Sequence, residues 1–124
     1  MFNFLLLISA IVLITLDYVY LKVMKVYFEN QVKMVQGKDL KMNYLSAIIC
    51  YIFLITGLNY FIIRPNKTTS DAFLLGMLLY GVSETTNYAI FTNWSLLTVI
   101  IDTLWGGVLF ASTTYISSIL RIYL

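Results

Sequence analysis

Four long apolar segments constrain the fold of this chain more than any other feature of its sequence. They lie at about residues 2–21, 43–63, 71–91 and 96–120 of the 124 residues. A helix needs roughly 20 mostly apolar residues to cross about 30 Å of hydrocarbon, and each of the four segments has that length. The sequence therefore predicts an all-α membrane protein in which residues 1–124 form a single four-helix transmembrane domain.

Short polar connections between the segments predict how the four helices are arranged. Gly37 interrupts the chain before the second segment, Arg64-Pro65-Asn66 ends that segment, and Thr92-Asn93 leads into the fourth. Residues of these types break helices or cap new ones. Helices joined in this way are neighbours that alternate in direction, so we expect an up-down bundle.

The longest polar stretch, residues 22–41, is also expected to contain a helix. Met24, Phe28, Val32 and Val35 recur through it at helical spacing. This pattern favours a helix that runs past the membrane surface, or lies along it, over an irregular loop.

The composition excludes several classes of protein. Hydrophobic residues make up 60% of the chain and charged residues 11%, against about 45–50% and about 25% in soluble domains, so a soluble enzyme is excluded. The net charge of +2 provides no clustered basic surface, and nucleic acid is not an expected partner. With one Cys and no His, the chain can form neither an internal disulfide nor a Cys/His zinc site. We expect no cofactor, and the pattern does not identify a metal ion.

Basic residues near the ends of the segments indicate the orientation, because cytoplasmic loops carry an excess of Lys and Arg. The first loop has five lysines, at positions 22, 25, 33, 38 and 41, whereas the opposite side has Arg64, Lys67 and Arg121. We therefore expect an integral, multi-pass membrane protein whose first and third loops are cytoplasmic. Its first expected partner is the lipid bilayer.

Three of the six acidic residues, Asp17, Glu84 and Asp102, fall inside the predicted spans. Each would cost at least about 2.5–3.5 kcal/mol at mid-helix on insertion scales, and no basic residue inside a span offsets them. At about 1.5 Å per residue, they lie about 6, 10 and 9 Å below the boundary on the first-loop side. We expect the three side chains to meet at one depth, in a polar pocket open toward that side.

The predicted pocket also includes neighbours of the acids, because residues three and four apart share a helix face. Tyr20, at i+3 from Asp17, is expected beside that acid. Gly106 and Gly107 are expected to permit a close helix approach. The predicted binding residues are the three acids, their helix neighbours and the residue of the second segment at the same depth: Asp17, Tyr51, Tyr80, Glu84, Asn87, Asp102 and Trp105.

Two interpretations of the acids remain open at this point. They could be hydrogen-bonded contacts that hold four helices in register, at around 0.6 kcal/mol each. Three acids at one depth without a basic partner repel one another, however, so we expect at least one to be protonated unless water or a cation enters. Because such intramembrane acids are usually functional, we favour a functional site.

A series of short stretches, taken in their order and spacing, resembles a known family. These stretches are Leu16-Asp17, Ala47, Tyr51, Gly57, Phe61, Arg64-Pro65, Tyr80, Thr86-Asn87, Trp94, Asp102 and Trp105-Gly106. Over nearly its whole length the chain resembles the small four-span membrane proteins of bacteria and large viruses grouped as domain of unknown function 2177. Glu84 stands where that family usually has Asp, and Tyr20 where it usually has Trp. The resemblance implies the four-span membrane fold and no particular activity.

Several functions fit this pattern. The first is a protein that binds or translocates a proton or small cation through Glu84 and Asp102, as a homo-oligomer and most simply a dimer. The second is a membrane module that binds a lipid or an isoprenoid-like amphipathic ligand. A structural partner subunit is a further alternative. A membrane enzyme with Mg²⁺ on paired carboxylates ranks lower, because such sites generally need more oxygen ligands, so we lean against an enzyme.

Overall fold

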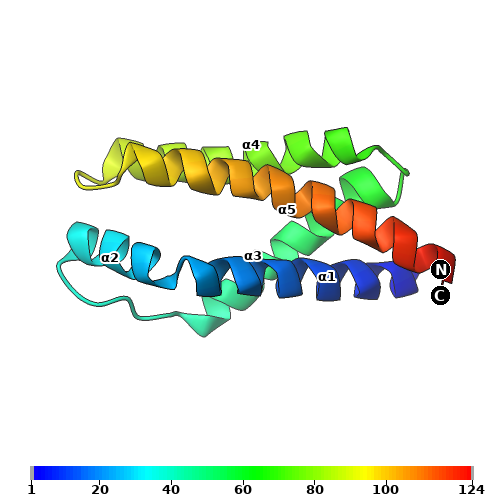
Figure 1. Ribbon diagram of the computed structural model, residues 1–124, viewed down its shortest axis with the longest axis horizontal. Coiled ribbons are helices and arrows are strands. Elements are labelled where there is room, and N and C mark those ends of the chain that lie inside the picture. Colours follow the sequence, from blue (N-terminus) through cyan, green and yellow to red (C-terminus); the bar gives the residue numbers. More distant parts are fainter. Residues whose placement is uncertain (1, 124) are drawn as a thin grey trace.

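The computed structural model describes residues 2–123, and all the regular elements in this range are helices (Figure 1). They are, in order along the chain, α1 Phe2–Val23, α2 Lys25–Gln36, α3 Tyr44–Leu58, the π-helical turn η1 Asn59–Ile63, α4 Thr69–Ile90 and α5 Leu96–Tyr123. Helices thus occupy all four ranges of the apolar segments. The prediction of a helix within residues 22–41 is confirmed by α2.

Local capping interactions explain where several of these helices begin and end. The Asn43 side chain accepts a hydrogen bond from the backbone N–H of Ser46 at the start of α3. Thr68 forms a reciprocal capping box with Asp71 at the start of α4. Gly37 ends α2 in the left-handed conformation, at φ 72°, which glycine adopts without a steric penalty. The break predicted at Gly37 is therefore confirmed.

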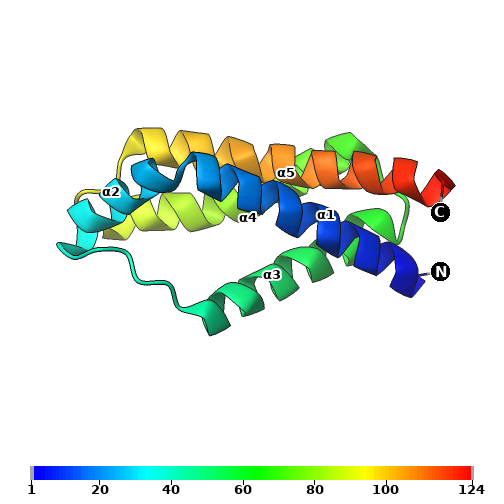
Figure 2. The ribbon, with the colours of Figure 1, turned by 60° about the horizontal axis from the view of Figure 1, so that its bottom comes forward.

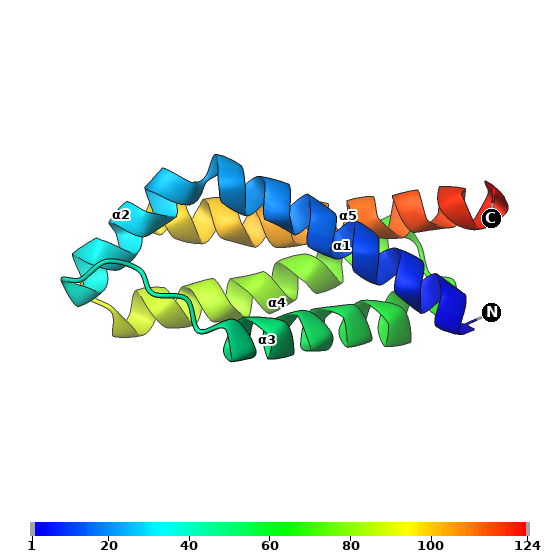
Figure 3. The same ribbon diagram turned by 90° about the horizontal axis from the view of Figure 1, so that it is seen from below.

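The helices α1, α3, α4 and α5 run back and forth along one long axis (Figures 1 and 3). Both ends of the chain lie at one end of this axis, and α2 lies with the α4–α5 turn at the other (Figure 1). The helix α5 packs against both α4 and α1. By contrast α3 lies at the edge of the assembly, and its N-terminal half diverges from the other helices (Figure 2).

A small apolar core fills the middle of the molecule. Leu13, Leu58, Leu109 and Phe110 are fully buried and come from α1, α3 and α5. On the outer surface, by contrast, large apolar side chains are exposed, such as that of Phe53. A lipid bilayer would cover these exposed apolar side chains.

Glycine residues bring α4 and α5 unusually close together. A Cβ atom on Gly106 would lie 2.6 Å from the carbonyl oxygen of Gly76 and would collide with the ring of Tyr80. A Cβ atom on Gly107 would lie 2.8 Å from the ring of Phe73. The expectation that these two glycines permit a close helix approach is confirmed.

Three helices of the described residues are long and apolar enough to cross a membrane: Phe4–Val23, Tyr44–Ile63 and Leu96–Tyr123. The mean hydropathy of their most apolar windows is 2.3, 2.0 and 1.6. The 22 residues of α4 give it sufficient length, but α4 is not among the three, because its polar side chains, including Asp71 and Glu84, lower its hydropathy. Helices that cross a membrane are in contact with the lipid bilayer.

Candidate functional site

The three acids of the predicted spans line one cavity of about 230 Å³, which we call the acid cavity. Its walls come from α1, α2, α4, the turn before α5, and α5. The lining residues are Asp17, Tyr20, Leu21, Phe28, Gln31, Val32, Tyr80, Glu84, Trp94 and Asp102. The depth arithmetic placed the three acids at one depth, and all three line this cavity. It did not predict that α2 forms the wall on the first-loop side, where the sequence suggested an opening.

Asp17 is buried and joins three helices. The Tyr51 hydroxyl of α3 donates a hydrogen bond to Oδ2 of Asp17, and Nε1 of Trp105 in α5 donates one to Oδ1 at 2.9 Å. Because both oxygens already accept hydrogen bonds, this carboxylate ties α1 to α3 and α5. The predicted site residues Tyr51 and Trp105 therefore contact the cluster through Asp17.

Asp102 is partly exposed and has a different set of partners. The Tyr20 hydroxyl donates a hydrogen bond to Oδ1 of Asp102 at 3.0 Å. The Tyr20 ring stacks on Trp105, with 4.3 Å between ring centroids and 3° between ring planes. Tyr20 was expected beside Asp17, and it lines the same cavity as Asp17, although its hydroxyl donates to Asp102. The Tyr20 side chain crosses to α5, because the flat face of Trp105 holds its ring there.

Glu84 is buried in α4, where it meets two other elements. Nε1 of Trp94 donates a hydrogen bond to Oε1 of Glu84 at 2.9 Å. Glu84 and Asp102 line the same cavity. Two ionised carboxylates in one cavity repel each other, and a proton or a cation between them relieves that repulsion.

No basic side chain is paired with these acids within residues 2–123. The ion pair present in that range joins Lys33 to Asp39 at 3.8 Å, and both side chains are exposed. The same range also lacks any group of three or more His, Cys, Asp or Glu arranged to hold a metal ion. The negative charge of the cluster is thus met by hydroxyl and indole donors.

The other two predicted site residues, Tyr80 and Asn87, differ in whether they line the acid cavity. Tyr80 lines the acid cavity, as the sequence suggested. Asn87 does not line it, and among the described residues its side chain has no hydrogen bond. A step of three residues turns a helix by about 300°, so Asn87 lies about 60° around α4 from Glu84. That offset takes it off the cavity wall.

Sequence reasoning missed Gln31, which fixes α2 to the turn before α5. Its side chain is 4% exposed. Nε2 donates to the carbonyl oxygen of Asn93 at 2.9 Å, and Oε1 accepts from the Thr98 hydroxyl at 2.7 Å and from the Ser95 N–H at 3.1 Å. The signal was a polar residue three positions after Phe28, on the apolar stripe of the predicted helix.

A second cavity of about 520 Å³ lies between α3 and α4, and we call it the side cavity. Its walls are mostly apolar, and a carboxyl group lies among them. The lining residues are Ser46, Ile49, Cys50, Phe53, Leu54, Leu79, Tyr80, Ser83 and Asp102. Tyr80 and Asp102 line the acid cavity as well, so these two residues form the boundary between the two cavities.

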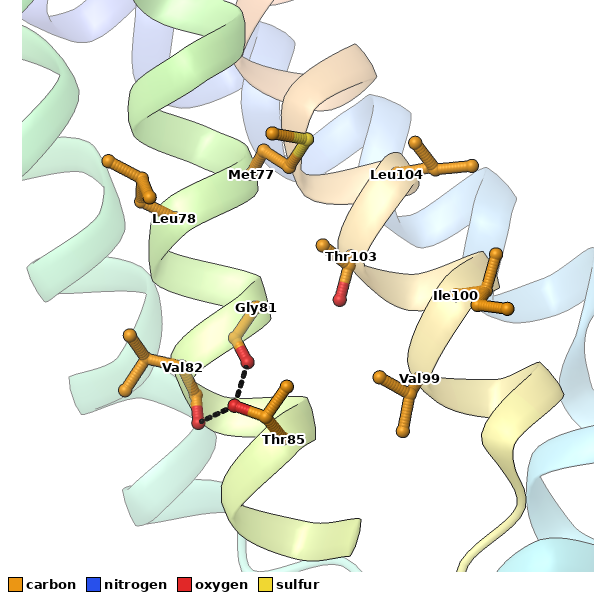
Figure 4. Close-up of a pocket in the computed structure, with 9 residues that line it drawn as sticks. All are labelled: Met77, Leu78, Gly81, Val82, Thr85, Val99, Ile100, Thr103 and Leu104. Carbon is orange, nitrogen blue, oxygen red and sulfur yellow. Dashed lines mark hydrogen bonds between the residues drawn. The ribbon is translucent and has the colours of Figure 1, made fainter.

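A third hollow of about 530 Å³, between α4 and α5, contains none of the three acids (Figure 4). Val82, Val99 and Leu104 are among the apolar side chains around it. The Thr85 hydroxyl donates to the carbonyl oxygen of Gly81 at 2.6 Å, within its own helix (Figure 4). The Thr103 hydroxyl, which also lines this hollow, is buried without a hydrogen-bond partner in the described part of the chain. The remaining lining is mostly apolar, so the hollow suits lipid chains.

Comparison with known proteins gives one match. The model of a family described as "Predicted membrane protein (DUF2177)" matches residues 2–119. No curated protein and no solved structure matches the chain.

Proposed function

We propose that this chain, which belongs to the DUF2177 family of predicted membrane proteins, binds and relays a proton or a small cation in its acid cavity, within the bilayer. Glu84 and Asp102 are the exchangeable carboxyls in this proposal. Asp17 is the positioning residue, since its two oxygens hold Tyr51 and Trp105. The family description gives a membrane location and no activity.

The proposal includes α4 as a fourth membrane span. Its 22 residues extend about 33 Å at about 1.5 Å per residue, which exceeds the roughly 30 Å of hydrocarbon. The C-terminal end of η1 and the N-terminal end of α5 lie at opposite ends of the molecule (Figure 1). If both neighbouring helices cross the bilayer, α4 has to bring the chain back across it. Its acidic face is sheltered by α5 and α2.

The observation that carries the proposal is that Glu84 and Asp102 line one cavity together with Asp17, without a basic partner among the described residues. A proton that such a pair of carboxyls holds is a charge that a cation can replace. Acids buried for structure alone would be stabilised by a basic residue or by donors on every oxygen. Asp17 has such donors, whereas each of these two has one indole or hydroxyl donor.

One chain does not offer an open path from side to side. Beyond Asp17 the interface of α1 and α5 is filled by Leu13 and Leu109, and Phe110 is fully buried beside them. Relay across the membrane therefore requires a movement of helices or a path lined by a second copy. We propose a homo-oligomer, with the first and third loops on the cytoplasmic side.

The test is ion flux into proteoliposomes. Wild-type protein should carry protons or potassium faster than a double variant, Glu84→Gln with Asp102→Asn, which keeps the shape of both side chains and removes their charges. A matched control is Glu29→Gln with Asp39→Asn, since both of these acids are exposed. The control should match wild type. Equal rates in wild type and the acid-cavity variant would exclude the proposal.

The side cavity favours a second candidate function, the binding of a lipid or an isoprenoid-like molecule. Its volume of about 520 Å³ lies within the range of about 300–1,000 Å³ typical of small-molecule pockets. Native mass spectrometry after gentle extraction tests this candidate. A retained lipid-sized mass that is lost in Asp102→Asn supports it, and protein that is empty after extraction from several host membranes argues against it.

A further inference from the structure

We propose that the side cavity binds a lipophilic cation, whose positive group meets Asp102 and whose apolar chain lies between α3 and α4. A long-chain alkylammonium ion is the simplest member of this class. The inference rests on the proposed function, because it takes Asp102 to be an exchangeable carboxyl, and it adds the kind of ion exchanged and the route by which that ion arrives.

The route is lateral, from the apolar phase of the membrane. In its N-terminal half α3 diverges from the other helices (Figure 2), and its side chains remain exposed on the side that lines the cavity. Ile49 is 43% exposed and Phe53 is 73% exposed. A molecule dissolved in the bilayer can therefore reach the cavity between α3 and α4 without passing through water.

The chemistry of the walls selects an amphiphile with a positive head. Ile49, Phe53 and Leu79 offer apolar surface to a hydrocarbon chain. Asp102 offers a carboxylate that accepts one hydrogen bond, from Tyr20. No Lys or Arg lines the cavity. An anionic head would be repelled there, and an uncharged head would leave the carboxylate without a counter-charge.

The position of Asp102 between the two cavities links cation binding to proton release. When the ammonium group approaches from the side cavity, its charge replaces the proton that the pair of Asp102 and Glu84 holds in the proposed function. That proton leaves to water by way of the acid cavity, so one positive charge arrives and one departs. The titratable side chains grouped around Asp102 are all acids, phenols or a thiol: Asp17, Tyr20, Cys50, Tyr51, Tyr80 and Glu84.

The experiment compares two probes with the same chain and different heads, dodecylammonium and dodecanol, on purified full-length protein in lipid nanodiscs. Calorimetry measures the affinity, and a pH indicator in weak buffer measures proton release. We expect dodecylammonium to bind about tenfold or more tightly than dodecanol and to release protons. This comparison uses wild-type protein and so does not depend on any variant folding.

Two neighbouring residues of α3 provide a matched pair of variants. Ile49→Trp places a large ring in the side cavity, whereas Ile48→Trp places it on an exposed position that does not line the cavity. The first should weaken dodecylammonium binding about tenfold, and the second should leave it unchanged. Asp102→Asn should abolish the preference for the charged head.

Equal affinities for the two probes, or equal effects of Ile49→Trp and Ile48→Trp, would overturn this inference. In that event the flux measurement separates the two proposals. Proteoliposomes in which wild type still exceeds the acid-cavity variant would leave the proposed function standing, with an inorganic ion or a proton as the only species exchanged.

Discussion

At the scale of single residues, the proposed function divides the acid cluster into a positioning acid and a pair of exchangeable acids. Asp17 is enclosed by donors from two other helices, Tyr51 and Trp105. Glu84 and Asp102 accept one hydrogen bond each, from Trp94 and from Tyr20. The sequence alone does not distinguish the three acids from one another. The number of hydrogen-bond donors around each carboxylate does.

The Tyr51 hydroxyl is predicted to stabilise the fold through Asp17. Tyr51→Phe removes one donor and leaves Oδ2 of a buried carboxylate without its partner. The free energy of unfolding, measured by titration with a denaturing detergent, should fall by about 1–2 kcal/mol. Tyr88→Phe is the control, because Tyr88 is 50% exposed and should change the stability little. A Tyr51→Phe protein as stable as this control would contradict the role given to Asp17.

Much of the site could be predicted from the sequence, because helix rise alone fixes depth. Counting residues from the span ends placed Asp17, Glu84 and Asp102 together. Rotamers and contacts between helices are not fixed by counting. Tyr20 therefore reaches Asp102 and not Asp17, and Trp94, which reads as an interfacial aromatic residue, donates to Glu84.

At the scale of helices, the pairs differ in how firmly they are joined. The backbones of α4 and α5 approach so closely at Gly76 and Gly106 that no side chain fits between them. The helix α2 is fixed to the turn before α5, and to α5 itself, by the buried amide of Gln31. The Asn93 side chain, which donates to the carbonyl oxygen of Met34, and the hydrogen bond between the Tyr27 and Thr98 hydroxyls join the same elements. The N-terminal half of α3 has neither kind of contact.

A methyl group added at the α4–α5 contact is predicted to be destabilising. In Gly106→Ala the new Cβ would collide with the Tyr80 ring and the Gly76 carbonyl, so the free energy of unfolding should fall by about 1–3 kcal/mol. Gly57→Ala is the matched control, since a Cβ there meets nothing within 4 Å. That variant should gain about 0.5–1 kcal/mol from helix propensity. The same unfolding titration checks both, and the opposite order of stability would contradict the close approach.

The amide of Gln31 is predicted to hold α2 in place. Gln31→Ala removes its hydrogen bonds to Asn93, Ser95 and Thr98. Backbone amides of α2 should then exchange with deuterium about tenfold faster or more, because α2 opens locally at lower cost. In Gln36→Ala, which loses only contacts to Lys38 and Asp39 in the adjoining loop, exchange in the middle of α2 should stay near the wild-type rate. Unchanged exchange in Gln31→Ala would show that other contacts hold α2.

The length of the apolar segments predicted the helices better than any other part of the fold. The side cavity could not be predicted, because it depends on the angle at which α3 leaves the others, and no local pattern specifies that angle. The interaction of Gln31 with the turn before α5 joins residues more than sixty positions apart, and no spacing rule within one helix reaches that far.

At the scale of the whole molecule, the proposed arrangement has four membrane crossings. Three helices qualify by length and composition, and α4 is the fourth. The buried Glu84 of α4 lines the acid cavity and accepts a hydrogen bond from Trp94, and the exposed Thr85 and Thr86 donate to carbonyl oxygens of their own helix. The insertion cost of these side chains is therefore lowered by partners inside the protein, a contribution that a hydropathy average over one helix does not include.

Cysteine labelling in sealed vesicles is predicted to show that α4 crosses the bilayer. In a Cys50→Ser background, Lys38→Cys and Thr92→Cys should react with an impermeant maleimide from the same side, and Asn66→Cys from the other side. All three positions lie in exposed connections. If Asn66→Cys and Thr92→Cys label from the same side, α4 does not cross. The excess of lysine in the first loop predicts that Lys38 and Thr92 lie on the cytoplasmic side.

The loose attachment of α3 has a mechanical consequence. Through Leu58 and η1 its C-terminal end is embedded in the core, while Tyr51 is fastened to Asp17 near the middle. A helix that is fixed at its C-terminal end and near its middle moves most at its N-terminal end. Thermal motion of α3 would thus widen and narrow the mouth of the side cavity, while Asp102 stays still on the rigid pair formed by α4 and α5. The width of the opening would then vary, while the carboxylate that receives the cation would keep its position.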